Sequence, residues 1–117
     1  MNSGVLEISR PPLSVKDLDL HQVIDRFRSV LSSKGAKEAY LFGSFAQGTH
    51  GYWSDIDLLV VMETDLPFPD RPQLVWEVME IGVPVDILVY TPEEFGKLCK
   101  INEGFWRLFN ESKVRIV

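Results

Sequence analysis

The segment Tyr40–Met62, which reads YLFGSFAQGTHGYWSDIDLLVVM, decides how this chain folds. Two apolar runs enclose a glycine-containing loop, and the second run begins with two acids, Asp55 and Asp57. Residues i and i+2 of a strand point to the same face, with their Cα atoms roughly 6.5–7 Å apart. Two carboxylates at that spacing repel each other unless cations lie between them, and two divalent metal ions about 3.5–4 Å apart would fit. We therefore expect a cation site here.

The residues after Asp55 indicate where along the strand the acids lie. One face of the predicted strand consists of the apolar residues Ile56, Leu58 and Val60. The other face begins with Asp55 and Asp57 and becomes apolar at Leu59. The strand is therefore expected to be buried on both faces except at its first residues, which places the acids at the rim of the sheet.

Three pieces of sequence in this order resemble the signature of a known family. Gly43-Ser44, then Gly48, and then the run Ser54–Leu58 are similar to the motif of the nucleotidyltransferase superfamily related to DNA polymerase beta. The chain resembles most closely the minimal nucleotidyltransferases of that superfamily, over roughly residues 15–95. The third acid that this family carries on a neighbouring strand is matched by Asp86, in the apolar run Val85–Tyr90.

The resemblance implies roles for five residues. Asp55 and Asp57 would bind two Mg²⁺ or Mn²⁺ ions, and Asp86 would bind the catalytic ion beside the attacking oxygen. Gly43 and Ser44 would contact the terminal phosphates of a nucleoside triphosphate such as ATP, at the start of a helical turn. The activity implied is in-line displacement of pyrophosphate by an acceptor hydroxyl.

Four of these residues also have a simpler structural interpretation. Gly43 and Ser44 can form a turn and a helix cap, Asp57 can be a turn acid, and Asp86 can be an acid at the beginning of a strand. One departure from the family pattern is Gln47, where minimal nucleotidyltransferases often carry an arginine. His50, in the same loop, is expected to be exposed.

Composition indicates a single globular domain. We assign 1–13 to an N-terminal arm and 14–117 to one domain, with 45% hydrophobic and 25% charged residues overall. No apolar run approaches the ~20 residues of a membrane span, and the lone Cys99 fits a reducing cytoplasm. The net charge of −5 argues against broad binding of nucleic acid.

Hydrophobic periodicity predicts an α/β (α+β) fold, a small mixed β-sheet with helices mainly on one face. The apolar stripe from Leu20 to Leu31 predicts a first helix, preceded by a capping pair, Ser14 and Asp17. Strands are predicted at 39–42, 55–62, 85–90 and 114–117, with a further short one at 5–8, and later helices begin near 71, 92 and 102. The connection between the strands at 39–42 and 55–62 is too short for a parallel crossover, so we expect that pair to be antiparallel.

The acceptor is expected to come from outside this chain, because larger family members hold it in an extra domain. The resemblance implies a helical HEPN-family partner protein, with this chain as an antitoxin that transfers AMP to the partner; a second copy of the chain is the other source. Four aromatic residues are candidates for an interface, and we expect at least two of them to be core instead: Trp76, Phe105, Trp106 and Phe109. Two alternatives stay open, a module that neutralises a partner by contact alone and a small-molecule transferase.

Overall fold

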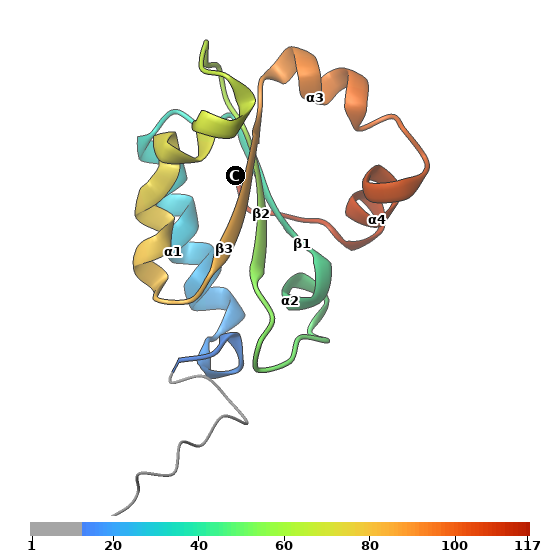
Figure 1. Ribbon diagram of the computed structural model, residues 1–117. Coiled ribbons are helices and arrows are strands. Elements are labelled where there is room, and N and C mark those ends of the chain that lie inside the picture. Colours follow the sequence, from blue (N-terminus) through green and yellow to red (C-terminus); the bar gives the residue numbers. More distant parts are fainter. Residues whose placement is uncertain (1–12) are drawn as a thin grey trace, which may run out of the picture.

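A four-stranded mixed sheet forms the centre of the protein in the computed structural model, which describes residues 13–117 (Figure 1). The strands are β1 (Glu38–Phe42), β2 (Ile56–Val61), β3 (Val85–Tyr90) and β4 (Val114–Arg115), in the spatial order β3-β2-β1-β4. The helical elements are η1 (Val15–Asp17), α1 (Leu20–Ser33), α2 (Gly43–Gln47), η2 (Phe68–Ile81), α3 (Pro92–Leu98) and α4 (Gly104–Ser112). The predicted strand at 5–8, and the predicted arm except for its last residue, lie outside the described residues.

The strand directions place the acidic residues side by side. β1 and β2 are antiparallel, as predicted, with Phe42 opposite Asp57. β2 and β3 are parallel, with Asp57 opposite Asp86. The direction of β3 was left open by the sequence, and it is parallel because the η2 segment carries the chain back to the same end of the sheet before β3 begins.

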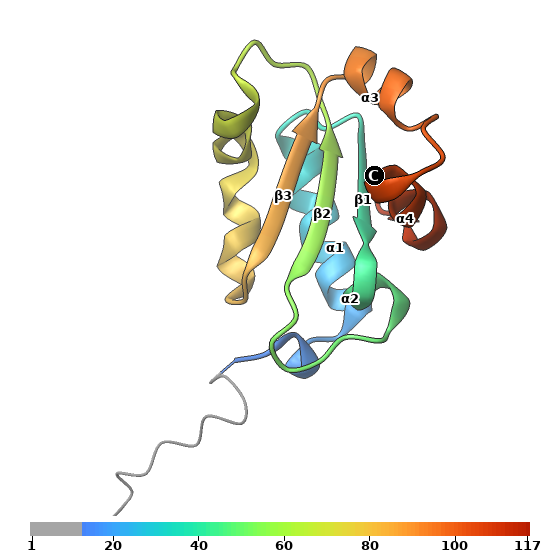
Figure 2. The same ribbon diagram turned by 45° about the vertical axis from the view of Figure 1, so that its right-hand side comes forward.

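One face of the sheet is covered by α1 and η2 (Figures 1 and 2). The first helix contributes its predicted stripe, of which Val23, Phe27 and Leu31 are at most 1% exposed. These side chains pack on the strand residues that point to this face of the sheet: Ala39, Leu41, Ile56, Leu58, Val60, Val85, Ile87 and Val89. The alternation predicted for β2 is confirmed, since Ile56, Leu58 and Val60 all belong to this core.

The opposite face carries a second core beneath α3 and α4, which lie on the other side of the sheet in both views (Figures 1 and 2). Its buried members are Tyr40, Phe42, Leu59, Val61, Phe95, Trp106 and Phe109. The mixed sheet is as predicted, and the two longest helical segments, α1 and η2, share one face, whereas the shorter α3 and α4 cover the other face, which was not predicted. The physical reason is that the strands present apolar side chains on both faces beyond their first residues, so both faces need cover.

Two of the helical elements begin with capping boxes. Ser14 and Asp17 form a capping box, although it opens the short η1, and α1 begins separately at Leu20 with Asp19 as its cap. Thr91 and Glu94 form the second capping box, at the start of α3. The predicted helix from about 71 is present as η2, a tightly wound segment that is interrupted at Val75 (φ −130°, ψ 28°). No helix among the described residues is long and apolar enough to cross a membrane.

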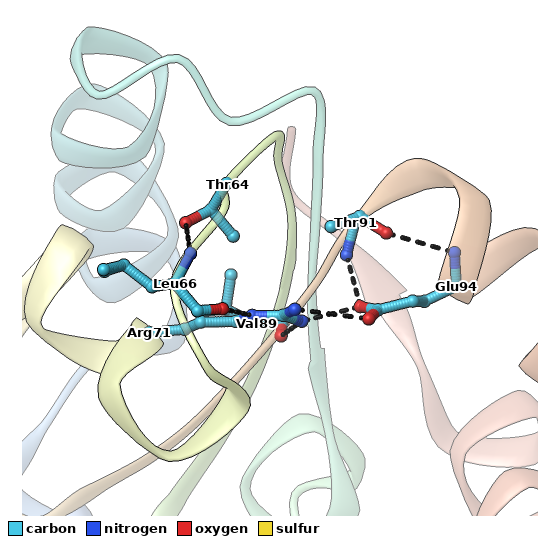
Figure 3. Close-up of polar contacts among 6 residues, drawn as sticks. All are labelled: Thr64, Leu66, Arg71, Val89, Thr91 and Glu94. Carbon is cyan, nitrogen blue, oxygen red and sulfur yellow. Dashed lines mark hydrogen bonds and ion pairs between the residues drawn. The ribbon is translucent and has the colours of Figure 1, made fainter.

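Arg71 is the charged residue that joins the two layers, and it was not anticipated. Its side chain, 7% exposed, donates to the carbonyls of Leu66 (2.9 Å) and Val89 (3.2 Å). Its guanidinium also forms two bonds to the carboxylate of Glu94, at 2.6 and 3.2 Å (Figure 3). The same carboxylate accepts the backbone N–H of Thr91 at 2.9 Å. One buried arginine therefore connects η2, the end of β3 and the start of α3.

Candidate active site

The three predicted carboxylates lie together at the end of the sheet where β2 and β3 begin. Asp57 and Asp86 are partners in the parallel register, so their side chains point to the same face. Asp55 immediately precedes β2, and its carboxyl group lies near that of Asp86, whose protonated form it can stabilise by accepting a hydrogen bond. The structure therefore brings Asp86, from a neighbouring strand, beside the two acids at the start of β2.

The proximity of these carboxylates changes how they titrate. Partial burial, reinforced by the negative charges of Asp86 and Asp55, raises the pKa of Asp57 to about 6. The pKa of Asp86 is also raised, first by desolvation and then by the charge of Asp55 and the hydrogen bond to it. Like-charge repulsion contributes to the raised pKa of both residues, but desolvation is the larger cause. A cation bound between the carboxylates would remove the repulsion and lower both pKa values.

A pocket of about 330 Å³ adjoins the carboxylates of Asp57 and Asp86. Its other lining residues are Phe42, Ile87, Leu88 and Phe105. The ring of Phe105, from α4, packs edge-on against Phe42 and remains 39% exposed. The site thus combines an acidic end with apolar walls, and small-molecule pockets in general are mostly apolar with a few converging polar groups.

The Gly43-Ser44 turn lies directly against the acidic site. Gly43 follows Phe42, the β1 partner of Asp57, and it has a left-handed backbone (φ +75°). A Cβ at this position would collide with the carboxylate of Asp57. Only glycine therefore allows the turn to approach the acid so closely. The predicted helical turn is α2, whose first N–H groups have no carbonyl partner within the helix.

The donor set fits Mg²⁺ or Mn²⁺. Among residues 13–117, no three His, Cys, Asp or Glu side chains by themselves surround a position for a metal ion. Mg²⁺ characteristically uses one or two carboxylates and completes its shell with water and substrate phosphates, instead of an all-protein cage. Asp57 and Asp86, which line one pocket beside the turn, provide two such oxygen donors. Asp55, outside that lining, interacts with the site through Asp86.

Two other residues of the loop between α2 and β2, His50 and Trp53, lie away from the carboxylate pocket. His50 was expected to be exposed, but its ring lies 5.0 Å from that of Phe45, and its Nδ1 atom is buried without a hydrogen-bond partner. Trp53 is 66% exposed and lines a smaller pocket with Tyr52, away from the Asp57 side chain. The structure brings neither residue into the pocket between Asp57 and Asp86.

Sequence reasoning missed Ser112, at the end of α4. Its hydroxyl accepts the backbone N–H of Gly43 at 3.0 Å, and its carbonyl accepts the side-chain amide of Gln47 at 2.9 Å. No local signal marks such a residue, because it is separated from Gly43 by 69 positions. Phe105 was singled out only as an interface candidate, and its position in the pocket became visible with the fold.

Comparison with known proteins gives a consistent result. The family model described as "Nucleotidyltransferase domain" matches residues 24–115. A protein of Methanocaldococcus jannaschii named "putative protein adenylyltransferase" is 34% identical over 74% of this chain and 86% of its own length. A crystal structure of a toxin–antitoxin with AMP-PNP has a TM-score of 0.59 at 21% identity, covering 80% of this chain and 72% of that one. A structure described as a "putative minimal nucleotidyltransferase" has a TM-score of 0.57 at 22% identity, covering 88% and 96%.

The two solved structures, at these identities, establish the fold, and the family model and the archaeal relative establish the family. The region that the family model matches extends from α1 to β4. It therefore includes the acidic site, the Gly43-Ser44 turn and helices on both faces of the sheet. This chain belongs to the nucleotidyltransferase family.

Proposed function

We propose that this protein transfers AMP from ATP to a hydroxyl group of a partner protein, with Mg²⁺ or Mn²⁺ as the cofactor. The observation that carries the proposal is the register that sets Asp57 opposite Asp86, with the Gly43 turn packed on Asp57. A cation site is thereby joined to a turn that can approach phosphate closely. Relatives named as protein adenylyltransferases support AMP as the transferred group and protein as the acceptor.

The residues act on different parts of the nucleotide. Asp55, Asp57 and Asp86 would hold the cations, which supply charge neutralisation and acidify the attacking hydroxyl. The hydroxyl oxygen of Ser44 and the amides of Ser44 and Phe45 would contact the terminal phosphates. The N–H of Gly43 is already donated to Ser112, so Gly43 contributes close approach to the phosphates instead of a hydrogen bond.

In the reaction, the acceptor oxygen forms a bond to the α-phosphorus while the bond to the bridging α,β-oxygen breaks. Pyrophosphate leaves with the electron pair, and the acceptor proton passes to solvent or to Asp86. Because the pKa of Asp57 is about 6 in the absence of a cation, this carboxylate is mostly ionised at pH 7.5 and ready to bind one.

A helical HEPN-type protein is the acceptor we propose, which would make this chain its antitoxin. A toxin–antitoxin complex among the structural neighbours supports this choice. The test is mass spectrometry of the co-expressed and purified partner after incubation with ATP and Mg²⁺. A gain of one AMP that requires Asp57 and Asp86 is the expected result; an unmodified partner whose toxicity is nevertheless blocked would contradict transfer.

A contact-only antitoxin is the second candidate, and exposed apolar side chains favour it. Trp76 is 57% exposed and Leu108 is 54% exposed, and both are large enough to anchor an interface. An Asp55→Asn, Asp57→Asn double variant separates the candidates. If transfer is the function, the variant binds the partner but does not protect the cell; if contact is the function, it protects as well as the wild type.

A further inference from the structure

We propose that Ser112 is a positioning residue for the triphosphate, because it holds both ends of α2 beside the acidic site. This inference rests on the proposed nucleotide-binding role of the Gly43-Ser44 turn. Gly43 is the first residue of α2 and Gln47 is the last, and each donates one hydrogen bond to Ser112. The two bonds use different acceptors, the side-chain hydroxyl and the backbone carbonyl.

Both bonds satisfy groups that the helices themselves leave unpaired. The N–H of Gly43 lies in the first turn of α2, and the carbonyl of Ser112 lies in the last turn of α4, where no further helical residue can pair with it. The Ser112 hydroxyl in turn donates to the carbonyl of Leu108 at 2.9 Å, which determines the direction of its proton and directs a lone pair at Gly43. Ser112 is 6% exposed, so water competes poorly for these bonds.

The consequence for the turn is that it is held from two sides. On one side the carboxylate of Asp57 occupies the space that a Cβ of Gly43 would need, and on the other side Ser112 accepts the Gly43 N–H. α2 has only five residues and cannot maintain its position alone. The amides of Ser44 and Phe45 are therefore aimed by α4, the same helix that supplies Phe105 to the pocket wall.

The same geometry gives Gln47 a role. Its side-chain amide donates to the Ser112 carbonyl. This hydrogen bond requires only that the side chain at position 47 carries a donor and is long enough to reach. An arginine at this position would also be a donor and has no acceptor group. We infer that Gln47 anchors the end of α2 and does not act as a phosphate ligand.

The test measures binding of Mg²⁺ with α,β-methylene ATP, which cannot lose pyrophosphate, and binding of AMP, by calorimetry at 20 °C. For Ser112→Ala the expected result is about a tenfold weaker affinity for the triphosphate, the equivalent of one lost hydrogen bond of about 1.4 kcal/mol, with AMP affinity changed less than twofold. In a variant whose melting curve shows it folded at 20 °C, loss of a residue that only stabilised the fold would lower the melting temperature and leave both affinities unchanged.

Matched variants keep the test decisive. Ser33→Ala is the control, because the Ser33 hydroxyl likewise donates to a carbonyl of its own helix, that of Val30 (2.7 Å); it should leave both affinities unchanged. Gln47→Arg should retain triphosphate affinity and Gln47→Met should lose it, and this pair carries the test if Ser112→Ala does not fold. If the wild type binds the triphosphate and Ser112→Ala binds it equally well, the positioning role of Ser112 is overturned but the proposed function is not. Absence of wild-type triphosphate binding overturns the proposed function together with it.

Discussion

Asp57 lies directly opposite Asp86 in the parallel register of β2 and β3, and both carboxylates line the same pocket. Two acids in adjacent positions on neighbouring strands destabilise each other when both are ionised. Their arrangement is understandable as a site in which a cation supplies the missing positive charge.

Removing one of the two charges should stabilise the metal-free protein and abolish its response to metal. At pH 7.5 we expect Asp57→Asn to raise the melting temperature of the metal-free chain by about 4 °C, corresponding to roughly 1 kcal/mol. Millimolar Mg²⁺ with ATP should raise the melting temperature of the wild type and leave that of the variant unchanged. Asp65→Asn is the control, because Asp65 lies outside the site. If Asp57→Asn still responds to Mg²⁺ and ATP, the assignment of Asp57 as a ligand is contradicted.

The stability of the metal-free protein should depend on pH through Asp57. Its pKa rises from an ordinary value of 3.8 to about 6 on folding, so the folded state binds this proton more tightly than the unfolded state. The stability gained from protonation is complete below about pH 4 and is lost as the pH rises through 6. The difference in melting temperature between Asp57→Asn and the wild type should therefore grow from pH 4 to pH 7. A constant difference over that range would show that the pKa of Asp57 is not raised. Comparing the two proteins cancels the opposite contribution of carboxylates such as Glu94, whose pKa is lowered by Arg71.

Gly43→Ala should reduce the stability of the protein more than the same substitution at Gly35, another glycine with a left-handed backbone. The new Cβ would both strain the backbone and collide with the Asp57 carboxylate. Gly35 has a similar φ of +87° but no atom within 4 Å of an added Cβ, so Gly35→Ala isolates the backbone contribution of about 1 kcal/mol. In chemical denaturation we expect Gly43→Ala to lose at least 1 kcal/mol more than Gly35→Ala and to lose affinity for Mg²⁺ with ATP. Equal losses of stability would mean that the close approach to Asp57 is absent in solution.

The Arg71–Glu94 pair should be important for stability. Glu94→Gln leaves the buried guanidinium of Arg71 without a countercharge, and we expect a loss of about 2 kcal/mol, less than for a fully buried pair because the Glu94 side chain is 42% exposed. Glu93→Gln is the control, since Glu93 pairs with Lys97 at the surface, where both side chains are more than three-quarters exposed; its effect should stay within about 0.5 kcal/mol. Urea denaturation of the two variants measures the difference, and similar values for both would contradict the structural role of Arg71.

Much of the local structure could be predicted from single stretches of sequence. The alternation from Asp55 to Val61 placed the acids and the apolar residues of β2 on the correct faces, because a strand has a strict period of two. Of the four aromatic interface candidates, Trp106 and Phe109 are core, as expected for at least two, whereas Trp76 and Phe105 are exposed. The cover of the second face by α3 and α4 was not predicted, because periodicity shows that a helix has an apolar face but not which side of a sheet it meets.

By itself, the sequence determined the strands, the caps, the acidic entry to β2 and the family resemblance carried by Gly43-Ser44 and the acids at 55, 57 and 86. These features depend on neighbours within a few positions, where backbone geometry alone relates one side chain to the next. Only the tertiary structure decided that β3 is parallel to β2 and in register with it, that Phe105 lines the pocket, and that Ser112 holds the turn at Gly43. Those relationships join residues far apart in the chain. The first depends on η2 returning the chain to the start of the sheet, and the other two depend on how α4 packs on its second face, which no local period encodes.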